Sequence, residues 1–336
     1  MTGAELTGAE LSRRFFAEVV RPLLDEAAPG LPYAAGRLGS GSDVLGLDDA
    51  MSRDHDWGCR LSLLVDEEDR DQVPRIRLLL EDKLPERVHG YPVRFPLTWD
   101  SSVTHKVDVS TVGDFAAGRL GVNPAGGLSV TDWVGLTGQR ALEVTAGPVF
   151  TDHTATLAPV RSLLAWYPRD VERYVLAAAW HRFGQTLPMV GRTAEAGDEL
   201  GSRLLSAGLA GDLLWLAFAV SRRWAPYAKW RGTVFRSLPV AAAVGPLLDA
   251  AVAAPGWRER EAALAGACEA LATRQRDRGL PAPSPAVTGF YGRPYRTVDP
   301  AMARDLLDGI TDPAVAALPA VLGSAGQRAP DDTQDR

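Results

Sequence analysis

Residues 36–58 read Gly-Arg-Leu-Gly-Ser-Gly-Ser-Asp-Val-Leu-Gly-Leu-Asp-Asp-Ala-Met-Ser-Arg-Asp-His-Asp-Trp-Gly, and the interpretation of the whole chain starts from this stretch. Two Gly-Ser steps, Gly39-Ser40 and Gly41-Ser42, follow a short apolar run, and Asp54 and Asp56 come soon afterwards. On a strand, residues two apart point to the same face, so this pair would present both carboxylates together. Paired carboxylates suit divalent cations, and a Gly-Ser turn offers amides and hydroxyls to a phosphate.

Size and composition are those of a soluble globular protein. The 336 residues allow two domains of ordinary size, and 46% are hydrophobic and 23% charged. A net charge of −6 and a pI near 5.5 argue against an extended nucleic acid as partner, because such binding depends on clustered Lys and Arg. Cys59 and Cys268 are too few for a zinc cluster, and a disulfide between them is disfavoured. With no recognisable membrane span or secretory signal, we expect a cytoplasmic protein without membrane contact.

The first part of the chain is predicted to mix helices and strands. Residues 9–27 have the apolar spacing of an amphipathic helix that Pro22 kinks or breaks, and 66–83 indicate a surface helix. Strands are expected over 32–38, 54–65, 91–97 and 103–112. Asp108 lies within the last of these β-branched runs, where propensity disfavours a carboxylate. Its position is therefore a second sign of a functional site.

The character of the sequence changes beyond Gly147-Pro148. Helices are predicted over 157–166, 171–183, 197–209, 213–224, 245–252 and 258–276. The predicted fold class is therefore α+β, with a small mixed sheet and flanking helices in residues 1–152 and an all-α bundle in 153–323. Residues 324–336 are polar without apolar periodicity and are predicted to form a disordered tail.

The order of these features resembles the nucleotidyltransferase superfamily that includes DNA polymerase beta. The shared order is a helix, a strand ending in Gly-Ser, an Asp-x-Asp pair, a third Asp on a later strand and a helical second domain. The two-domain layout is similar to that of the antibiotic nucleotidyltransferases acting on aminoglycosides and lincosamides. The string Asp54-His55-Asp56-Trp57-Gly58 also resembles an uncharacterised bacterial branch of the superfamily. The resemblance covers the core of the first domain well and the second domain only in outline.

Carried over to this chain, the resemblance implies a triphosphate cradle and a metal-binding triad. Gly39, Ser40, Gly41 and Ser42 would hold the triphosphate, although which of the two Gly-Ser pairs does so stays open. Asp54, Asp56 and Asp108 would be the catalytic carboxylates and the ligands of two Mg²⁺ ions, with Asp108 an option for the general base. The chemistry would be transfer of NMP from an NTP, ATP first among them, to a small hydroxyl-bearing acceptor, with release of pyrophosphate.

Other polar residues of the same stretch are interpreted as structural. His55 stands where the superfamily usually has an apolar residue, and we interpret it as a histidine packing behind the strand. The acidic residues Asp43, Asp48 and Asp49 are interpreted as a solvated face. The glycine spacing is wrong for a dinucleotide fingerprint, and no Gly-Lys-Ser follows for a Walker-type loop.

In the second domain, the run Arg222–Trp230 interleaves basic and aromatic residues. Lys229 is the proposed phosphate contact and Tyr227 a stacking partner for a base or sugar, in line with the related antibiotic nucleotidyltransferases. The alternative, a helix end with solvated arginines and a packed Trp, stays open. Asp198, Glu199 and Asp212 are interpreted as solvated, and His153 and His181 as structural. The aromatic run at 289–296 is either an ordered loop or a flap.

Two functions from different classes follow from the sequence. The first is a Mg²⁺-dependent nucleotidyltransferase acting on a small molecule. The second is a nucleotide-binding or regulatory module of the same fold without turnover. Transfer to RNA is disfavoured by the acidic composition, and transfer to a protein side chain stays open.

Overall fold

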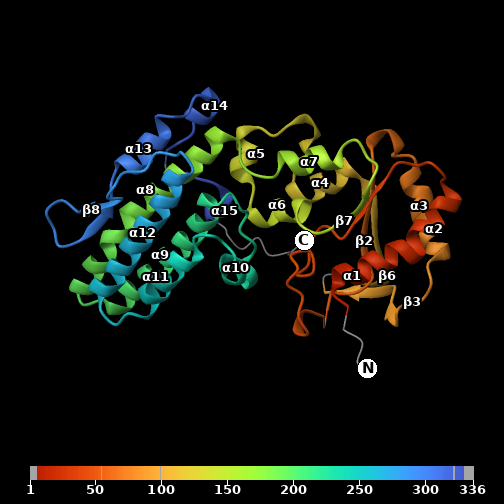
Figure 1. Cartoon of the computed structure of the whole chain (residues 1–336), viewed down its shortest axis with the longest axis horizontal. Helices are drawn as coiled ribbons and strands as arrows, with labels where there is room; N and C mark the ends of the chain where they lie inside the picture. Colours follow the sequence, from red (N-terminus) through yellow and green to blue (C-terminus); the bar gives the residue numbers. More distant parts are fainter. Residues whose placement is uncertain (1–5, 54, 99, 321, 329–336) are drawn as a thin grey trace. The chain divides into compact units, whose positions relative to one another are not determined.

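The computed structural model describes residues 6–53, 55–98, 100–320 and 322–328. The chain divides into two compact units (Figure 1). Of the described residues, the first unit holds those up to Leu128 together with Arg140–Ala165, and the second holds Ser129–Gln139 and those from Trp166 to Arg328. The predicted boundary after Asp152 differs from this division, in which residues 153–165 belong to the sheet unit and 129–139 to the helical unit.

A five-stranded mixed sheet forms the centre of the first unit. Its order is β5-β6-β2-β1-β7, in which β2 and β6 run parallel and the other neighbours antiparallel. The strands are β1 (Ala34–Gly36), β2 (Arg60–Val65), β5 (Arg94–Leu97), β6 (Asp100–Thr111) and β7 (Val149–Asp152). A separate short pair joins β3 (Arg87–Val88) to β4 (Tyr91–Pro92). The predicted fold class, a small mixed sheet followed by a mainly helical part, is confirmed.

Helices pack on the sheet because their apolar sides repeat at helical spacing. Leu11, Phe15 and Val20 are fully buried against Leu63 and Val109 in one core, as the spacing predicts. The helical stretch runs without interruption through α1 (Gly8–Phe15), a π-helical turn (Phe16–Val20) and α2 (Arg21–Ala27). Pro22, which lacks an N–H, is the second residue of α2 and follows directly after the π-helical turn, so the chain departs from regular α-helical hydrogen bonding there but the helix does not end. Also in this unit are α3 (Gln72–Lys83), α4 (Val112–Leu120), most of α6 (Gly138–Thr145) and α7 (Leu157–Leu163).

The strand predicted over 54–65 is shorter than expected. It begins only at Arg60, and the described residues before it form bends, with Asp56 at φ 54° in the left-handed region. Gly58 has φ 147°, and a Cβ built on it would lie 3.0 Å from the nearest ring carbon of Phe95. The backbone conformation of Gly58, which other residues rarely adopt, separates Asp56 from the strand. The prediction that Asp56 lies on this strand is therefore wrong, and Asp54 lies outside the described residues.

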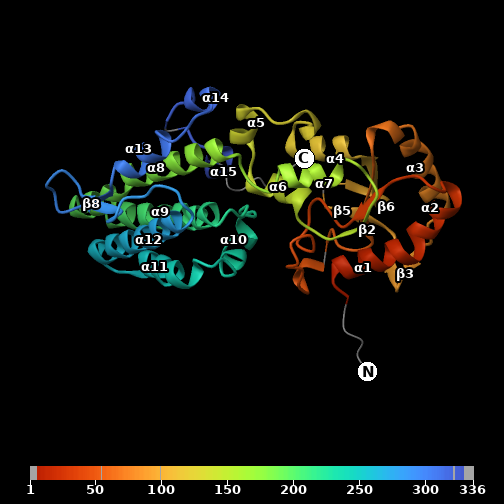
Figure 2. The same ribbon diagram turned by 45° about the horizontal axis from the view of Figure 1, so that its top comes forward.

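Four long helices build the core of the second unit (Figure 2). They are α8 (Arg169–Glu195), α9 (Glu199–Val220), α11 (Ala241–Ala253) and α12 (Trp257–Asp277). Two helices predicted over 197–209 and 213–224 are one helix, α9, because buried Leu209, Leu213 and Leu216 outweigh the weak helix propensity of Gly211. Shorter helices are α5 (Val130–Gly135), α10 (Ala228–Phe235), α13 (Ala301–Leu307), α14 (Pro313–Ala316) and α15 (Ala325–Arg328).

Two further features of the second unit differ from the sequence prediction. The aromatic run at 289–296 joins β8 (Val287–Gly289) to β9 (Arg296–Val298) in an antiparallel hairpin, so this unit is not purely α-helical. The predicted disordered tail is partly ordered, since Gln327 donates a hydrogen bond to the carbonyl of Val175 at 2.8 Å. The remainder of that prediction, residues 329–336, lies outside the described residues.

Helix α9 alone among the described helices is long and apolar enough to cross a membrane by length and composition. Half of that apolar window is buried inside the structure, where Leu213 and Leu216 are fully enclosed. A core helix of a globular unit passes the same test, and α9 packs as such a helix against α8, α11 and α12.

Candidate functional site

A buried ion pair shapes the glycine–serine turn that follows β1. Arg37 and Asp43 are 2% and 3% exposed, and the guanidinium meets the carboxylate through Nε to Oδ2 at 2.7 Å and Nη2 to Oδ1 at 2.8 Å. The same guanidinium donates to the carbonyls of Leu38 and Ser40, each at 2.7 Å. The Arg37 side chain thus holds the turn together through its bonds to Leu38, Ser40 and Asp43. Asp43 is a structural anchor and not the solvated residue that its sequence context suggests.

The neighbouring acidic residues are also engaged. Asp48 accepts hydrogen bonds from the Gly8 amide at 2.8 Å and from the Trp57 indole at 3.2 Å, and Asp49 accepts from the amide and hydroxyl of Ser52. The interpretation as a solvated face is therefore wrong for buried Asp43 and for half-buried Asp48, which fastens the loop to α1, but Asp49 is exposed, as that interpretation expects.

The backbone of the turn takes conformations that favour glycine. Gly39 has φ 84° and Gly41 has φ 136°. A Cβ on Gly41 would lie 2.3 Å from Oδ1 of Asp43 and 2.4 Å from Nη2 of Arg37. Within the described part of the chain, the amides of Ser40, Gly41 and Ser42 donate to no acceptor, whereas the Gly39 amide donates to the Glu143 carbonyl at 2.8 Å. Three successive amides are therefore available to a ligand, and free backbone amides in a turn are donors that an anion can use.

Arg60, the first residue of β2, joins the turn to Asp56. Its Nη2 donates to Oγ of Ser40 at 3.3 Å and its Nη1 to the carbonyl of Asp56 at 2.9 Å. Both acceptors are neutral. Burial lowers the pKa of Arg60 to about 9, with Arg37 adding to the effect, while Asp43 and Asp56 oppose it and Arg119 again lowers it. The guanidinium thus stays charged at neutral pH, although burial and two neighbouring guanidiniums disfavour its charge.

A second arginine joins the turn to Asp108. The position that a Cβ on Gly39 would take lies 3.2 Å from Nη2 of Arg119, and the same nitrogen is 3.4 Å from Oδ2 of Asp108. Asp108 pairs with Ser62 across the parallel strands β2 and β6 and is 47% exposed. Its neighbours Val107 and Val109 point into the core, so the alternation of β6 turns the carboxylate to the other face.

The structure therefore brings three of the predicted features into one neighbourhood. The turn at 39–42, Asp56 and Asp108 are connected through Arg60 and Arg119. The metal triad itself is not assembled by the described residues, among which no group of three His, Cys, Asp or Glu side chains surrounds a common point. Both carboxylate oxygens of Asp56 accept hydrogen bonds from Thr98, at 2.6 Å from the amide and 2.8 Å from the hydroxyl. His55 is exposed in the bend rather than packed behind a strand.

Sequence reasoning missed Arg37, Arg60 and Arg119. One signal for the first two was present, because each is a charged residue beside or within an apolar run, as Asp108 is. No local signal marks Arg119, whose role depends on α4 returning beside β6.

The basic and aromatic run of the second unit is held by a buried glutamate. Glu172, 1% exposed, accepts from Arg222, Arg278 and the Trp166 indole at distances from 2.6 to 3.3 Å. Burial raises the pKa of Glu172, but the hydrogen bonds and charges of Arg222 and Arg278 outweigh burial and hold that pKa below its usual range. Trp224 is buried against Trp166 and Tyr167, with ring centroids 4.7 and 4.6 Å apart.

Lys229 and Tyr227 lie at the start of α10. Tyr227 is the residue before the helix, and burial raises the pKa of its hydroxyl. Lys229 is exposed, with Nζ 4.9 Å from the ring centre of Trp230. Both residues belong to the second unit, and their predicted contact with a nucleotide stays a prediction.

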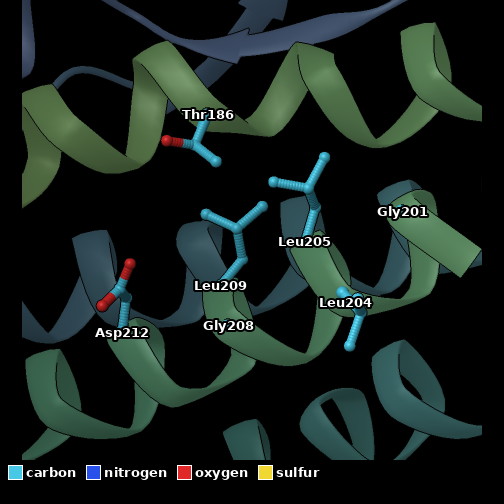
Figure 3. Close-up of a pocket in the computed structure, with 7 residues that line it drawn as sticks. All are labelled: Thr186, Gly201, Leu204, Leu205, Gly208, Leu209 and Asp212. Carbon is cyan, nitrogen blue, oxygen red and sulfur yellow. The ribbon is translucent and has the colours of Figure 1, made fainter.

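Of the three acidic residues singled out in the second unit, Asp198 and Glu199 have structural partners and Asp212 borders a pocket. Asp198 caps α9 through the Gly201 amide at 2.7 Å, and Glu199 pairs with Arg260 at 2.7 Å. Asp212 lies at one end of a pocket of about 490 Å³ in which Leu205 and Leu209 point towards Thr186 of α8 (Figure 3). The lining is mostly aliphatic, and burial raises the pKa of the Asp212 carboxyl while Arg182 lowers it.

Comparison with known proteins adds one match. Residues 133–231 match the family described as a domain of unknown function (DUF4037). The matched segment is less than a third of the chain and runs from α5 into α10, so it includes the Trp166, Tyr167 and Trp224 cluster and Lys229. No curated protein and no solved structure matches the chain.

Proposed function

We propose that this protein is a nucleotidyltransferase that moves NMP from an NTP to a hydroxyl group of a small-molecule acceptor and releases pyrophosphate. The observation that carries the proposal is the turn at 39–42, with three successive amides free of acceptors in the described chain and the charge of Arg60 beside them. The resemblance of the chain order to the polymerase-beta superfamily supplies the reaction class. An NTP and a small soluble acceptor also fit the cytoplasmic location that the sequence predicts.

The turn supplies what a triphosphate requires. The amides of residues 40–42 have no other acceptor in the described chain and can donate to an anion. Arg60 donates only to neutral acceptors there, so its charge can also pair with an anion. Because burial and neighbouring guanidiniums disfavour the charge of Arg60, an anion at this place would relieve that cost.

The two serines of the turn have different surroundings. The Ser40 hydroxyl accepts from Arg60, and the Ser40 residue is only 6% exposed. The Ser42 hydroxyl has no partner among the described residues, and its residue is half-buried. We therefore assign Ser42 to direct phosphate contact and Ser40 to positioning Arg60.

Magnesium belongs to the proposal through Asp54, Asp56 and Asp108. The ions would neutralise phosphate charge and bring the reacting oxygens together. The described carboxylates do not by themselves form the metal site, since no three of them surround a common point and Asp108 faces Arg119. What the protein supplies without the metal is a fixed cradle for the triphosphate and an exposed carboxylate, Asp108, beside it.

Calorimetry with ATP, CTP, GTP and UTP, each with and without Mg²⁺, tests the binding part of the proposal. We expect Arg60→Gln to raise the Kd for the bound NTP about ten- to hundredfold, since a charge-assisted hydrogen bond contributes about 1.5–3 kcal/mol. Ser42→Ala should weaken binding more than Glu68→Gln, a control at an exposed residue of the same unit. Equal NTP affinity in the parent protein and Arg60→Gln would refute the cradle.

Pyrophosphate release in the presence of a metabolite extract tests turnover. Asp54→Asn and Asp56→Asn should abolish release while the circular dichroism spectrum is retained. Full activity in both variants would refute the metal assignment.

The alternative is a nucleotide-binding module without turnover. The hydrogen bonds from Thr98 to both oxygens of Asp56 favour it, because they leave each oxygen only one lone pair for a metal ion. NTP binding that depends on Arg60, without pyrophosphate release under any condition tested, would select this alternative.

A further inference from the structure

A second pocket lies wholly within the helical unit, between α8 and the β8–β9 hairpin. Its volume is about 540 Å³, within the range of small-molecule sites. One wall is Trp180, His181, Gly184 and Gln185 of α8, and the other comes from the hairpin and the residues that follow it, up to Ala303.

The hairpin is fixed against α8 by specific contacts. Thr297 Oγ1 donates to the Gly184 carbonyl at 2.8 Å, and a Cβ on Gly184 would lie 3.2 Å from Cβ of Val298. On the other side of the hairpin, Glu269 accepts from the amides of Ala286 and Val287 at 2.8–3.0 Å. The glycine allows the close approach, so the pocket walls are set by the fold.

The tip of the hairpin presents two aromatic rings to the pocket. Phe290 and Tyr291 stand edge to face, with centroids 4.8 Å apart, and both line the cavity. Tyr291 is 88% exposed and has φ 48°, an unfavourable backbone conformation for a bulky residue. A large exposed aromatic residue held in a strained turn beside a cavity suggests a role in binding rather than in packing.

The charge of the lining has one sign. Asp299 is its only acidic residue, and no Lys or Arg occurs among the described lining residues. Oδ1 of Asp299 accepts from the Ala301 amide at 2.8 Å, while Oδ2 accepts from no described residue. Aromatic faces attract cations, and because Arg293 already lies over Phe290, 5.8 Å from its ring centre, Tyr291 is the ring left for a bound cation. The free carboxylate oxygen and the Tyr291 ring therefore select for a positive group attached to a flat apolar body.

We propose that this pocket binds a small organic cation with a flat apolar body, such as an aryl amine or amidine. His181 and Gln185, one helical turn apart on α8, offer hydrogen bonds to its polar edge. The site is separate from the proposed nucleotide site, since none of its lining residues is among those proposed to bind the nucleotide.

Calorimetric titration with benzamidine, benzamide and benzoate tests the proposal, because the three probes share size and shape and differ in charge. At low salt, benzamidine should bind about fivefold more tightly than benzamide, the effect of an ion pair worth about 1 kcal/mol, and benzoate most weakly. Raising the salt to about 0.5 M should reduce the preference for the cation.

Asp299→Asn should remove the preference for benzamidine over benzamide, while the affinity for benzamide stays within about twofold. Asparagine retains an oxygen for the Ala301 amide, so the fold is preserved, and thermal unfolding checks this. Asp249→Asn, at an exposed carboxylate of α11, is the control and should change nothing. Tyr291→Ala should weaken both neutral and cationic probes. Absence of benzamidine binding, tighter binding of benzoate, or an unchanged preference in Asp299→Asn would each overturn the proposal.

Discussion

Removing Asp43 tests whether the glycine–serine turn depends on its buried ion pair. Asp43→Ala leaves the Arg37 guanidinium, 2% exposed, without a charged partner, and the loss of one partner of a buried pair costs about 3–5 kcal/mol. The two hydrogen bonds from Arg37 to the carbonyls of Leu38 and Ser40 remain. We therefore expect the lower end, about 3 kcal/mol.

The chain offers a matched control for this substitution. Arg70 and Asp114 approach to 2.7 Å, as Arg37 and Asp43 do, but are 51% and 52% exposed. Solvent screens such a pair, so Asp114→Ala should cost about 0–1 kcal/mol. The two variants thus compare ion pairs with the same nitrogen–oxygen distance that differ in how deeply they are buried.

Hydrogen exchange measured by mass spectrometry is the appropriate assay, because a chain of two units need not unfold in one transition. Amides of β1 and β2 should exchange about a hundredfold faster in Asp43→Ala, since each 1.4 kcal/mol is about a factor of ten. Amides of α8 and α12 report on the other unit and should not change. An acceleration in Asp43→Ala no greater than that in Asp114→Ala would refute the reasoning.

Three further predictions follow from local geometry. Gly41→Ala should destabilise the sheet unit by more than about 1 kcal/mol, because the new Cβ would lie 2.3 Å from Oδ1 of Asp43. Gly46→Ala is the control, since Gly46 has φ 69° but no atom within 4 Å of a Cβ, and it should cost only about 1 kcal/mol. Equal losses of unfolding free energy in urea would contradict this prediction. The pKa of Glu172 is lowered in the folded state, so the ionised carboxylate contributes its full stability above the usual pKa of 4.5, and this contribution is lost as the pH falls through the pKa of the folded protein. Glu172→Gln should therefore lower Tm at pH 7 and make Tm fall less steeply towards acid pH. Parallel curves of Tm against pH for the parent and the variant would contradict the assignment. Burial raises the pKa of Cys59 to about 12 and that of Cys268 well above its usual range, so a thiol reagent at pH 8 should modify neither in the native protein and both in urea; rapid modification of either native thiol would be inconsistent with the structure.

Prediction from sequence succeeded where the information is local. The apolar spacing of residues 9–27 and 258–276 is enough to indicate a helix, and both segments are helical. It failed where packing overrides propensity, as in α9, which continues through Gly211 because buried leucines lie on either side. It also failed at 54–59, where Gly58 and Asp56 take positive φ values that apolar alternation does not reveal.

The candidate site shows the same division. The sequence marked the turn at 39–42 and Asp108 through unusual residues in apolar surroundings. It gave no indication that Arg60 reaches Ser40 across 20 positions, or that Arg119 lies beside Asp108. The first contact depends on the pairing of β1 with β2, and the second depends on α4 folding back beside the strand that it directly follows.

The sequence by itself determined the two-part α+β architecture, because hydrophobic periodicity is a property of neighbouring residues. It also determined where the glycines and serines of the turn occur. Only the tertiary structure decided that Asp43 is an anchor, that the charge of Arg60 has neutral partners, and that an aromatic hairpin closes a pocket with one carboxylate. A charged side chain acquires its role from the residues that folding places around it, and the sequence pattern does not show which residues these will be.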